Sequence, residues 1–275
     1  MNPYPVSIFA WYGYNEPLRH RLRHIQDAGF DSIMLWWGDS LAFYEYDKDS
    51  LIRLLAAHDL AIENIHAPYL DASRIWSPDA AERQRTVAAY LEWLDDCARY
   101  GIPTLVMHIC DRFDDIPSGA LGYGLGCLET LVRAAERLGV RIAVENTSHL
   151  HLLQYLLDRI DSAALGLCYD SSHGRLYEET PFALLRQYPT RLYALHLSDN
   201  DGVEDRHWEI GKGLIDWDGF AAAFPAGLYR GRLSLEIIQD DAGEDEAHFL
   251  RRARQCIDAL GAQLPAPPAA DLDAR

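Results

Sequence analysis

A polar loop in the C-terminal half of the chain carries residues that could bind a metal ion. Asp205 and His207 are two positions apart, and in extended backbone such side chains point the same way. His196 lies near the end of the apolar run that precedes this loop. A carboxylate beside imidazoles suits a divalent cation of the zinc or manganese type. The loop therefore predicts part of a metal site that other residues must complete.

Further acidic residues and histidines stand where short apolar runs end. A carboxylate on such a run, such as Glu145 in IAVEN or Glu236 in LSLEI, must be paired or coordinated. A single histidine there is more often a packed core or rim residue than a ligand. However, chance placement does not give Asp, Glu or His at six successive strand ends. The candidate metal ligands are His66, His108, Glu145, Asp170, His173, His196, Asp205, His207 and Glu236.

The composition limits the class of protein. Asp+Glu 42 against Lys+Arg 25 gives a formal net charge of -17, which argues against duplex DNA and favours a small-molecule substrate. The five cysteines show no close pairs, as expected for free thiols in a cytosolic protein. The N-terminus lacks a signal-peptide pattern, and no apolar stretch approaches the ~20 residues that span a bilayer. We expect a cytoplasmic protein without a membrane segment.

The candidate ligands depend on the elements that position them. Apolar, partly β-branched segments predict buried strands near residues 6–12, 32–37, 61–67, 104–109, 141–145, 165–170, 192–197 and 233–237. Amphipathic segments predict helices over residues 17–28, 77–100, 125–138, 152–160, 181–188, 217–224 and 244–260. Ser77 is the expected N-cap of the second of these helices, with Pro78 at its first position. Asp216, and Asp47 or Asp49, are further expected N-caps.

The alternation of strands and helices predicts an α/β protein with a single (β/α)8 TIM barrel, a fold of about 250 residues. An open doubly wound sheet is the alternative, but the segment FAWYGYNEP after the first strand has no glycine-rich phosphate loop. We assign residues 1–264 to the barrel and expect residues 265–275, rich in Pro and Ala and acidic, to form a flexible tail. In such a barrel the C-terminal strand ends face the active site, which would gather the candidate ligands.

The motifs at these strand ends resemble the xylose-isomerase-like TIM-barrel superfamily. They are HAPY, MHIC, VEN, CYDSSH, LHLSDND, DRHxxxGKGxIDW and LSLEI, and the resemblance covers roughly residues 6 to 260. The superfamily includes apurinic endonucleases of the endonuclease IV type as well as sugar-phosphate isomerases and epimerases. The resemblance therefore implies a divalent-metal enzyme and two kinds of reaction.

The two branches imply different metal sites. Resemblance to the endonuclease branch implies up to three zinc ions: one on His66, His108 and Glu145, one on Glu145, Asp170, His196 and Glu236, and one on His173, Asp205 and His207. Resemblance to the isomerase and epimerase branch implies one ion, such as Mn or Mg, on the second of these sets. Ketose epimerases also carry a glutamate where this chain has His151 and an arginine where it has Gly202.

Two reactions and one non-catalytic role remain open. Hydrolysis of a small sugar-phosphate or phosphodiester by a metal-bound hydroxide would use all the candidate ligands, since zinc lowers the pKa of bound water to about 7. Isomerisation would use Glu145 and Glu236 as catalytic acid and base. It leaves no specific role, other than lining a polar pocket, for His66, His108, Asp205 and His207. The third alternative is a metal-bound barrel that binds a ligand without turnover. We favour the phosphoesterase.

Five further residues are candidates for contact with a substrate. Arg206 and Lys212 lie in the loop that carries Asp205 and could contact phosphate, although solvated loop charges are the alternative. Trp11, Trp36 and Trp37 fall at the ends of the first two predicted strands. They could stack on a sugar ring or pack at the mouth of the barrel.

Overall fold

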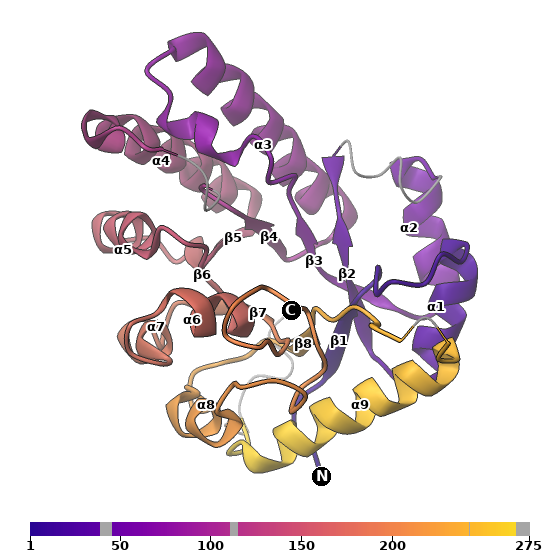
Figure 1. The fold of residues 1–275 in the computed structure, drawn as a ribbon. Coiled ribbons are helices and arrows are strands. Elements are labelled where there is room, and N and C mark those ends of the chain that lie inside the picture. Colours follow the sequence, from indigo (N-terminus) through magenta and orange to yellow (C-terminus); the bar gives the residue numbers. More distant parts are fainter. Residues whose placement is uncertain (39–45, 111–114, 242, 268–275) are drawn as a thin grey trace.

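The computed structural model describes residues 1–38, 46–110, 115–241 and 243–267. Parallel strands form a barrel in the order β7-β6-β5-β4-β3-β2-β1-β8. Their bounds are β1 (Val6–Phe9), β2 (Ser32–Trp36), β3 (Ala61–His66), β4 (Thr104–Met107), β5 (Arg141–Glu145), β6 (Leu165–Asp170), β7 (Leu192–His196) and β8 (Leu233–Leu235). Leu197 N donates to Ser234 O at 2.8 Å and Glu236 N donates to Leu197 O at 3.1 Å, which joins β7 to β8. The predicted (β/α)8 barrel is thus confirmed (Figure 1).

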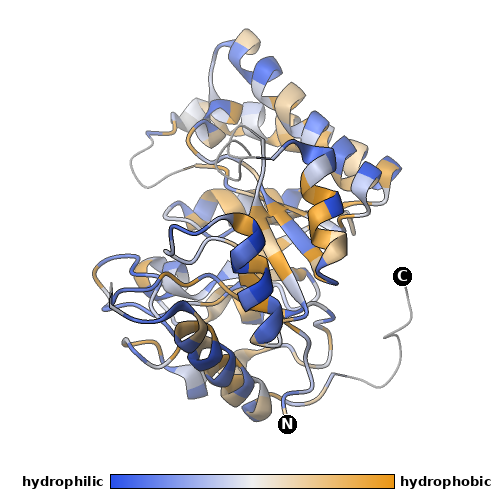
Figure 2. Ribbon diagram, turned by 90° about the vertical axis from the view of Figure 1, so that its right-hand side faces the viewer, coloured by the Kyte–Doolittle hydropathy of each residue, from blue (hydrophilic) through white to orange (hydrophobic). Residues whose placement is uncertain are grey.

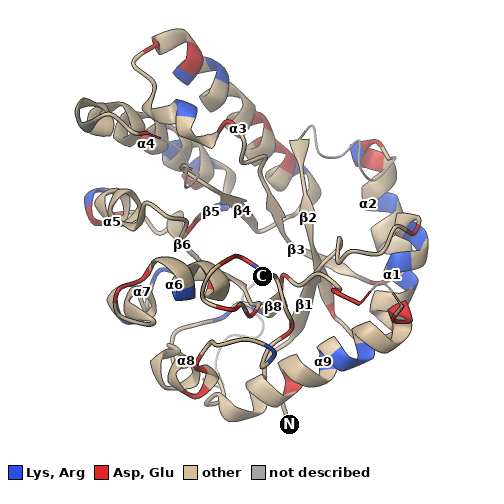
Figure 3. Ribbon diagram, viewed as in Figure 1, with Lys and Arg blue, Asp and Glu red and all other residues tan. Residues whose placement is uncertain are grey.

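Helices surround the strands on the outside of the barrel (Figure 1). They are α1 (Leu18–Asp27), α2 (Lys48–Ala57), α3 (Ala80–Tyr100), α4 (Leu121–Leu138), α5 (Leu150–Arg159), α6 (Ser171–Tyr177), α7 (Ala183–Gln187), α8 (Trp217–Ala223) and α9 (Glu246–Gln263), with short 3-10 helices η2 (Ala72–Trp76) and η3 (Ser118–Ala120). Apolar residues gather on the central strands in Figure 2, and Lys and Arg lie mainly on outer helices in Figure 3. Over the described ranges, no helix is long and apolar enough to cross a membrane.

Side-chain caps decide where several helices begin. Asp47 accepts a hydrogen bond from Ser50 N before α2, as the sequence predicts. The prediction that Ser77 caps α3 is wrong, because the helix begins at Ala80, where Asp79 accepts a hydrogen bond from Ala81 N. The Ser77 hydroxyl instead donates to Glu82 at 2.6 Å. Residues 268–275 of the predicted tail lie outside the described residues.

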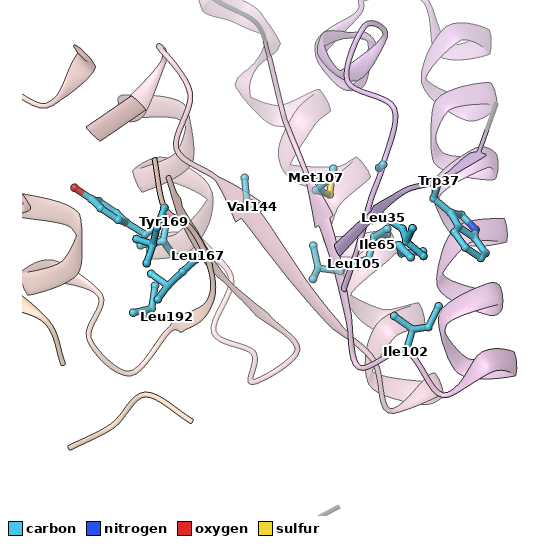
Figure 4. Close-up of a cluster of buried hydrophobic side chains, with 14 of the residues drawn as sticks. Leu35, Trp37, Ile65, Ile102, Leu105, Met107, Val144, Leu167, Tyr169 and Leu192 are labelled. Atoms are coloured by element: carbon cyan, nitrogen blue, oxygen red, sulfur yellow. The ribbon is translucent and has the colours of Figure 1, made fainter. Parts of the chain in front are cut away.

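Two apolar layers hold the strands in place. The larger layer lies between strands and helices and includes Leu35, Ile65 and Leu105 (Figure 4). The smaller cluster consists of Val106, Ala143, Cys168 and Ala194, which lie on β4 to β7, with Tyr193 packed against it. Because side chains alternate along a strand, Ala143 shares its side of the sheet with Glu145, and Ala194 shares its side with His196. The candidate ligands Glu145 and His196 at the strand ends therefore continue the rows of the smaller cluster.

Candidate metal centre

Glu145, at the end of β5, lies at the centre of the candidate ligands. Its Oε2 is 3.0 Å from His196 Nδ1 and 3.3 Å from His66 Nε2. Its Oε1 is 3.1 Å from His173 Nδ1 and 3.4 Å from His108 Nε2. The four histidines come from β7, β3, α6 and the residue after β4. They converge on one carboxylate that is only 2% exposed.

The register of the parallel strands brings further donors to this place. Asp170 is paired with His196 across β6 and β7. Glu236 follows β8 directly, and its Oε2 lies 2.8 Å from His196 Nδ1. His196 therefore lies between the carboxylates of Glu145 and Glu236, while its strand neighbour supplies another carboxylate.

Asp170 has a structural role as well as a free oxygen. Its Oδ1 accepts a hydrogen bond of 2.6 Å from His173 N and so caps α6, a short helix that the sequence did not predict. Asn146 fixes the Asp170 backbone, since its Oδ1 accepts from Asp170 N at 2.6 Å and its Nδ2 donates to Asp170 O at 3.0 Å. Asp170 Oδ2 is buried and has no hydrogen-bond partner among the described residues. A buried carboxylate oxygen without a donor is costly, and a cation beside it removes that cost.

The loop between β7 and α8 carries the remaining pair of candidate ligands. Asp205 Oδ2 lies 3.1 Å from His207 Nε2 and 3.3 Å from His173 Nε2. The Ser172 hydroxyl donates to Asp205 Oδ1 at 2.6 Å. His207 adopts a left-handed backbone conformation with φ 49, and its Nδ1 donates to the Glu236 carbonyl at 3.1 Å. These contacts hold the loop against the strand ends and direct His207 Nε2 toward Asp205.

The glycines of the Gly211-Lys212-Gly213 segment have a structural explanation. Asp199 accepts hydrogen bonds from Gly211 N at 3.0 Å, from Ile215 N at 3.0 Å and from Trp217 Nε1 at 2.9 Å. A Cβ at Gly213 would lie 2.2 Å from Asn200 O, so only glycine fits there without displacing the loop. The motif therefore folds the loop that presents Asp205 and His207.

Burial and charge act against each other in this cluster. Burial disfavours the ionised form of Glu145, but the adjacent His196 and His108 hold its pKa well below its usual range. Burial raises the pKa of Asp170 to about 7. Burial also opposes protonation of His207, yet its hydrogen bond to Asp205 and the nearby charge of Glu236 raise its pKa to about 9. Positive charge is thus favoured within the cluster, as a cation site requires.

Two compact groups of ligand atoms occur among the described residues. One consists of His66, Glu145 and His196, and the other of Glu145, Asp170, His196 and Glu236, with all ligand atoms of a group within 4.8 Å of one another. The second group has the same four members as the set that the resemblance assigns to one ion in both branches of the superfamily. His108 contacts the other oxygen of Glu145, and His173, Asp205 and His207 are joined through Asp205. Imidazole and carboxylate donors of this kind fit a divalent cation.

A cavity of about 300 Å³ opens onto this cluster. His66, His108, Glu145, His173, Asp205, His207 and Glu236 line it. Of the residues predicted to contact a substrate, Trp36 also lines it. Sequence reasoning missed Tyr69, Thr147, Ser148 and Tyr177, although each stands two to four positions after a candidate ligand. Their closeness in sequence to candidate ligands is the signal by which these cavity residues could have been predicted.

Four predicted substrate contacts do not line the cavity. The prediction for Trp37 is wrong, since it is fully buried among the outer helices and its Nε1 donates to Asp96 at 2.8 Å (Figure 4). Side chains alternate along β2, so Trp36 and Trp37 point to opposite sides. The remaining three are also turned elsewhere: Trp11 lies under the Arg21 guanidinium, Arg206 pairs with Asp201 and Glu204, and Lys212 pairs with Asp240.

The model of the xylose isomerase-like TIM barrel family matches residues 22–258. The chain belongs to this family. The uncharacterized protein y4fM of Sinorhizobium fredii is 28% identical in an alignment that covers 90% of this chain and 91% of that protein. A protein of Chlorobium phaeovibrioides named "Probable endonuclease 4" is 26% identical, with 83% of this chain and 80% of that protein covered.

The structure of D-psicose 3-epimerase with D-tagatose from Clostridium cellulolyticum H10 has a similar fold. It superposes with a TM-score of 0.77 at 17% identity, over 94% of this chain and 99% of that one. Similarity at this identity concerns the fold alone. The relative by sequence is thus named an endonuclease, whereas the neighbour by fold is named an epimerase. These names do not decide between the two reactions, and the residues of the site must be considered instead.

Proposed function

We propose that this protein is a divalent-metal-dependent hydrolase of a small phosphodiester, with zinc as the metal. The observation that carries the proposal is the position of Asp205, between His173 Nε2 and His207 Nε2 and beside the cluster around Glu145. Proton transfer on a sugar at a single ion gives no task to these three residues. A second or third cation would use all of them as ligands.

The formal charge of the site links the number of metal ions to the charge of the substrate. Glu145, Asp170, Asp205 and Glu236 contribute four negative charges when ionised. One divalent ion leaves the site at about -2, two bring it to about 0 and three bring it to about +2. In the part of the chain that the structure describes, no Lys or Arg lines the cavity. An anionic phosphodiester therefore needs more than one cation for favourable binding.

The residues of the chain would position these ions and the substrate. A bound divalent cation lowers the pKa of a water ligand and polarises a phosphoryl oxygen. Glu145 contacts histidines through both oxygens and is the residue suited to link two ions. Ser172 orients Asp205, and the Glu236 carbonyl orients His207, so the outer ligands are fixed by hydrogen bonds. The hydroxyl-bearing Tyr69 and Ser148 line the cavity and could donate to the substrate.

Epimerisation of an uncharged ketose is the second candidate. Glu145 and Glu236 both lie within 3.0 Å of His196 Nδ1 and line the same cavity. Together with Asp170 and His196 they form a compact four-ligand group. With one ion on this group, Glu145 and Glu236 would transfer the proton next to a carbonyl. A site that remains negative suits a neutral sugar.

Elemental analysis of the purified protein, together with a substrate panel, distinguishes the two candidates. We expect two to three zinc ions per chain and cleavage of bis(4-nitrophenyl) phosphate that a chelator abolishes and zinc restores. One ion per chain with turnover of D-fructose or D-tagatose would instead support the epimerase. A zinc-replete sample that cleaves no phosphodiester contradicts our proposal.

A further inference from the structure

A second cavity of about 300 Å³ lies between α6, the start of α7 and the segment before α8. We name it the α6–α8 cavity. Its apolar walls are Tyr169, Pro181, Phe182, Leu214 and Ile215. Helix α6 contributes to both cavities, since His173 and Tyr177 line the catalytic one whereas Gly174 and Arg175 line this one. The two cavities therefore have no lining residue in common.

The walls of the α6–α8 cavity are held firmly. Phe182 adopts a left-handed backbone conformation with φ 60, which is rare for an aromatic residue, and its ring packs edge-on against Phe220 at 5.9 Å. A Cβ at Gly174 would lie 2.3 Å from the Tyr169 hydroxyl, so glycine allows the tyrosine to close this side. A preformed apolar cavity of this size can accept one small ring or a short branched chain.

The two acidic residues that line the cavity already have partners. Glu178 accepts hydrogen bonds from Leu184 N at 2.9 Å and from the Tyr169 hydroxyl at 3.1 Å. Asp216 caps α8 by accepting a hydrogen bond from Gly219 N at 3.0 Å. Both carboxylates thus have local hydrogen-bond partners, and neither forms an ion pair with Arg175 among the described residues.

Arg175 is different, because it makes no hydrogen bond or ion pair with any residue that the structure describes. Its guanidinium lies against the backbone of Gly202, where a Cβ would come within 3.1 Å of Nη2. The lack of a side chain at position 202 leaves room for the guanidinium there, and Arg175 lines the cavity. A planar guanidinium binds carboxylates through two parallel hydrogen bonds.

We propose that the α6–α8 cavity binds a small apolar carboxylate. Its ring or chain would lie between Phe182 and Ile215, and its carboxylate would pair with the Arg175 guanidinium. This assignment does not depend on the proposed hydrolase, because it uses neither the candidate metal ligands nor the catalytic cavity.

Calorimetric titration of the metal-loaded protein tests the proposal with benzoate as the probe. We expect saturable binding of benzoate and binding at least about tenfold weaker for benzyl alcohol, which keeps the ring but lacks the charge. Arg175→Gln should weaken benzoate binding about tenfold or more, whereas Arg133→Gln, an exposed arginine of α4 that pairs with Glu129, should leave it unchanged.

A second variant and a crystal soak protect the test from a folding artefact. Leu214 is 63% exposed, so Leu214→Glu should fold normally and weaken benzoate binding by placing a carboxylate at the cavity. Benzoate should lie beside Arg175 in the soaked crystal. Benzoate bound only at the catalytic metal ligands, equal binding of benzyl alcohol, or unchanged affinity in both Arg175→Gln and Leu214→Glu would overturn the assignment.

Discussion

The candidate metal centre combines two regions that are built in different ways. The inner region consists of Glu145, Asp170 and His196, which stand at the ends of adjacent strands and are 2%, 0% and 0% exposed. The outer region consists of Asp205 and His207, whose loop side chains are 28% and 24% exposed. Strand register fixes the inner region. Two hydrogen bonds fix the outer one: Asp205 accepts from the Ser172 hydroxyl, and His207 donates to the Glu236 carbonyl.

This difference separates the two candidate reactions. Either reaction needs a cation in the inner region, because both use the carboxylates around His196. Only hydrolysis needs the outer region. The two regions meet at His173, whose Nδ1 faces Glu145 and whose Nε2 faces Asp205. Substitutions in the inner region should therefore impair metal binding in both regions. Substitutions in the outer region should impair metal binding in the outer region only.

The largest effect is expected for Glu145→Gln. The amide has nearly the same shape but removes the charge that balances four histidines, so cations should be lost from both regions. Phosphodiester cleavage should fall at least about a thousandfold, which corresponds to about 4 kcal/mol in the barrier. Metal content by elemental analysis and steady-state rates check this expectation. A variant that keeps its metal ions and a tenth of the activity would show that Glu145 does not link the metal ions.

A smaller and more selective effect is expected for His207→Ala. It should remove about one cation per chain and reduce phosphodiester cleavage about a hundredfold, while the inner region keeps its metal. Any turnover of a ketose should remain near normal. Metal content and both rates should be measured together.

Two companion variants make the His207 result interpretable. His207 has φ 49, and asparagine tolerates this conformation better than alanine does, so His207→Asn tests the loss of the imidazole with less backbone strain. His248→Ala, in α9, removes an exposed histidine that pairs with Glu244 and should change neither rate. Near-normal phosphodiester cleavage by both His207 variants would contradict the hydrolase.

The inner region could be anticipated from the sequence, while the details of the outer region could not. Nearly continuous apolar runs locate the strand ends, and barrel geometry then gathers Glu145, Asp170 and His196 without knowledge of any contact. Arg206 lies beside Asp205 in the sequence, but its pairing with Asp201 depends on how the loop folds, and no periodic pattern encodes that. Trp36, the last residue of β2, lines the cavity, whereas the next residue, Trp37, is buried. An error of one residue in the predicted strand therefore reverses which tryptophan is expected to face the substrate.

The smallest of these effects, and the sharpest comparison of the two regions, is expected for Ser172→Ala. Its hydroxyl donates to Asp205 Oδ1 at 2.6 Å, so its loss should let Asp205 rotate and weaken the outer cation about tenfold. Ser171→Ala is the matched control, because the hydroxyl of this neighbouring buried serine donates to backbone carbonyls, Ser198 O at 2.7 Å and His196 O at 3.4 Å. Among the described residues it forms no hydrogen bond with a candidate ligand side chain. Competition with a chelator should show weaker binding of one cation in Ser172→Ala and unchanged binding in Ser171→Ala. Equal losses in the two variants would mean that α6 as a whole, and not the Ser172 hydrogen bond, holds the outer region in place.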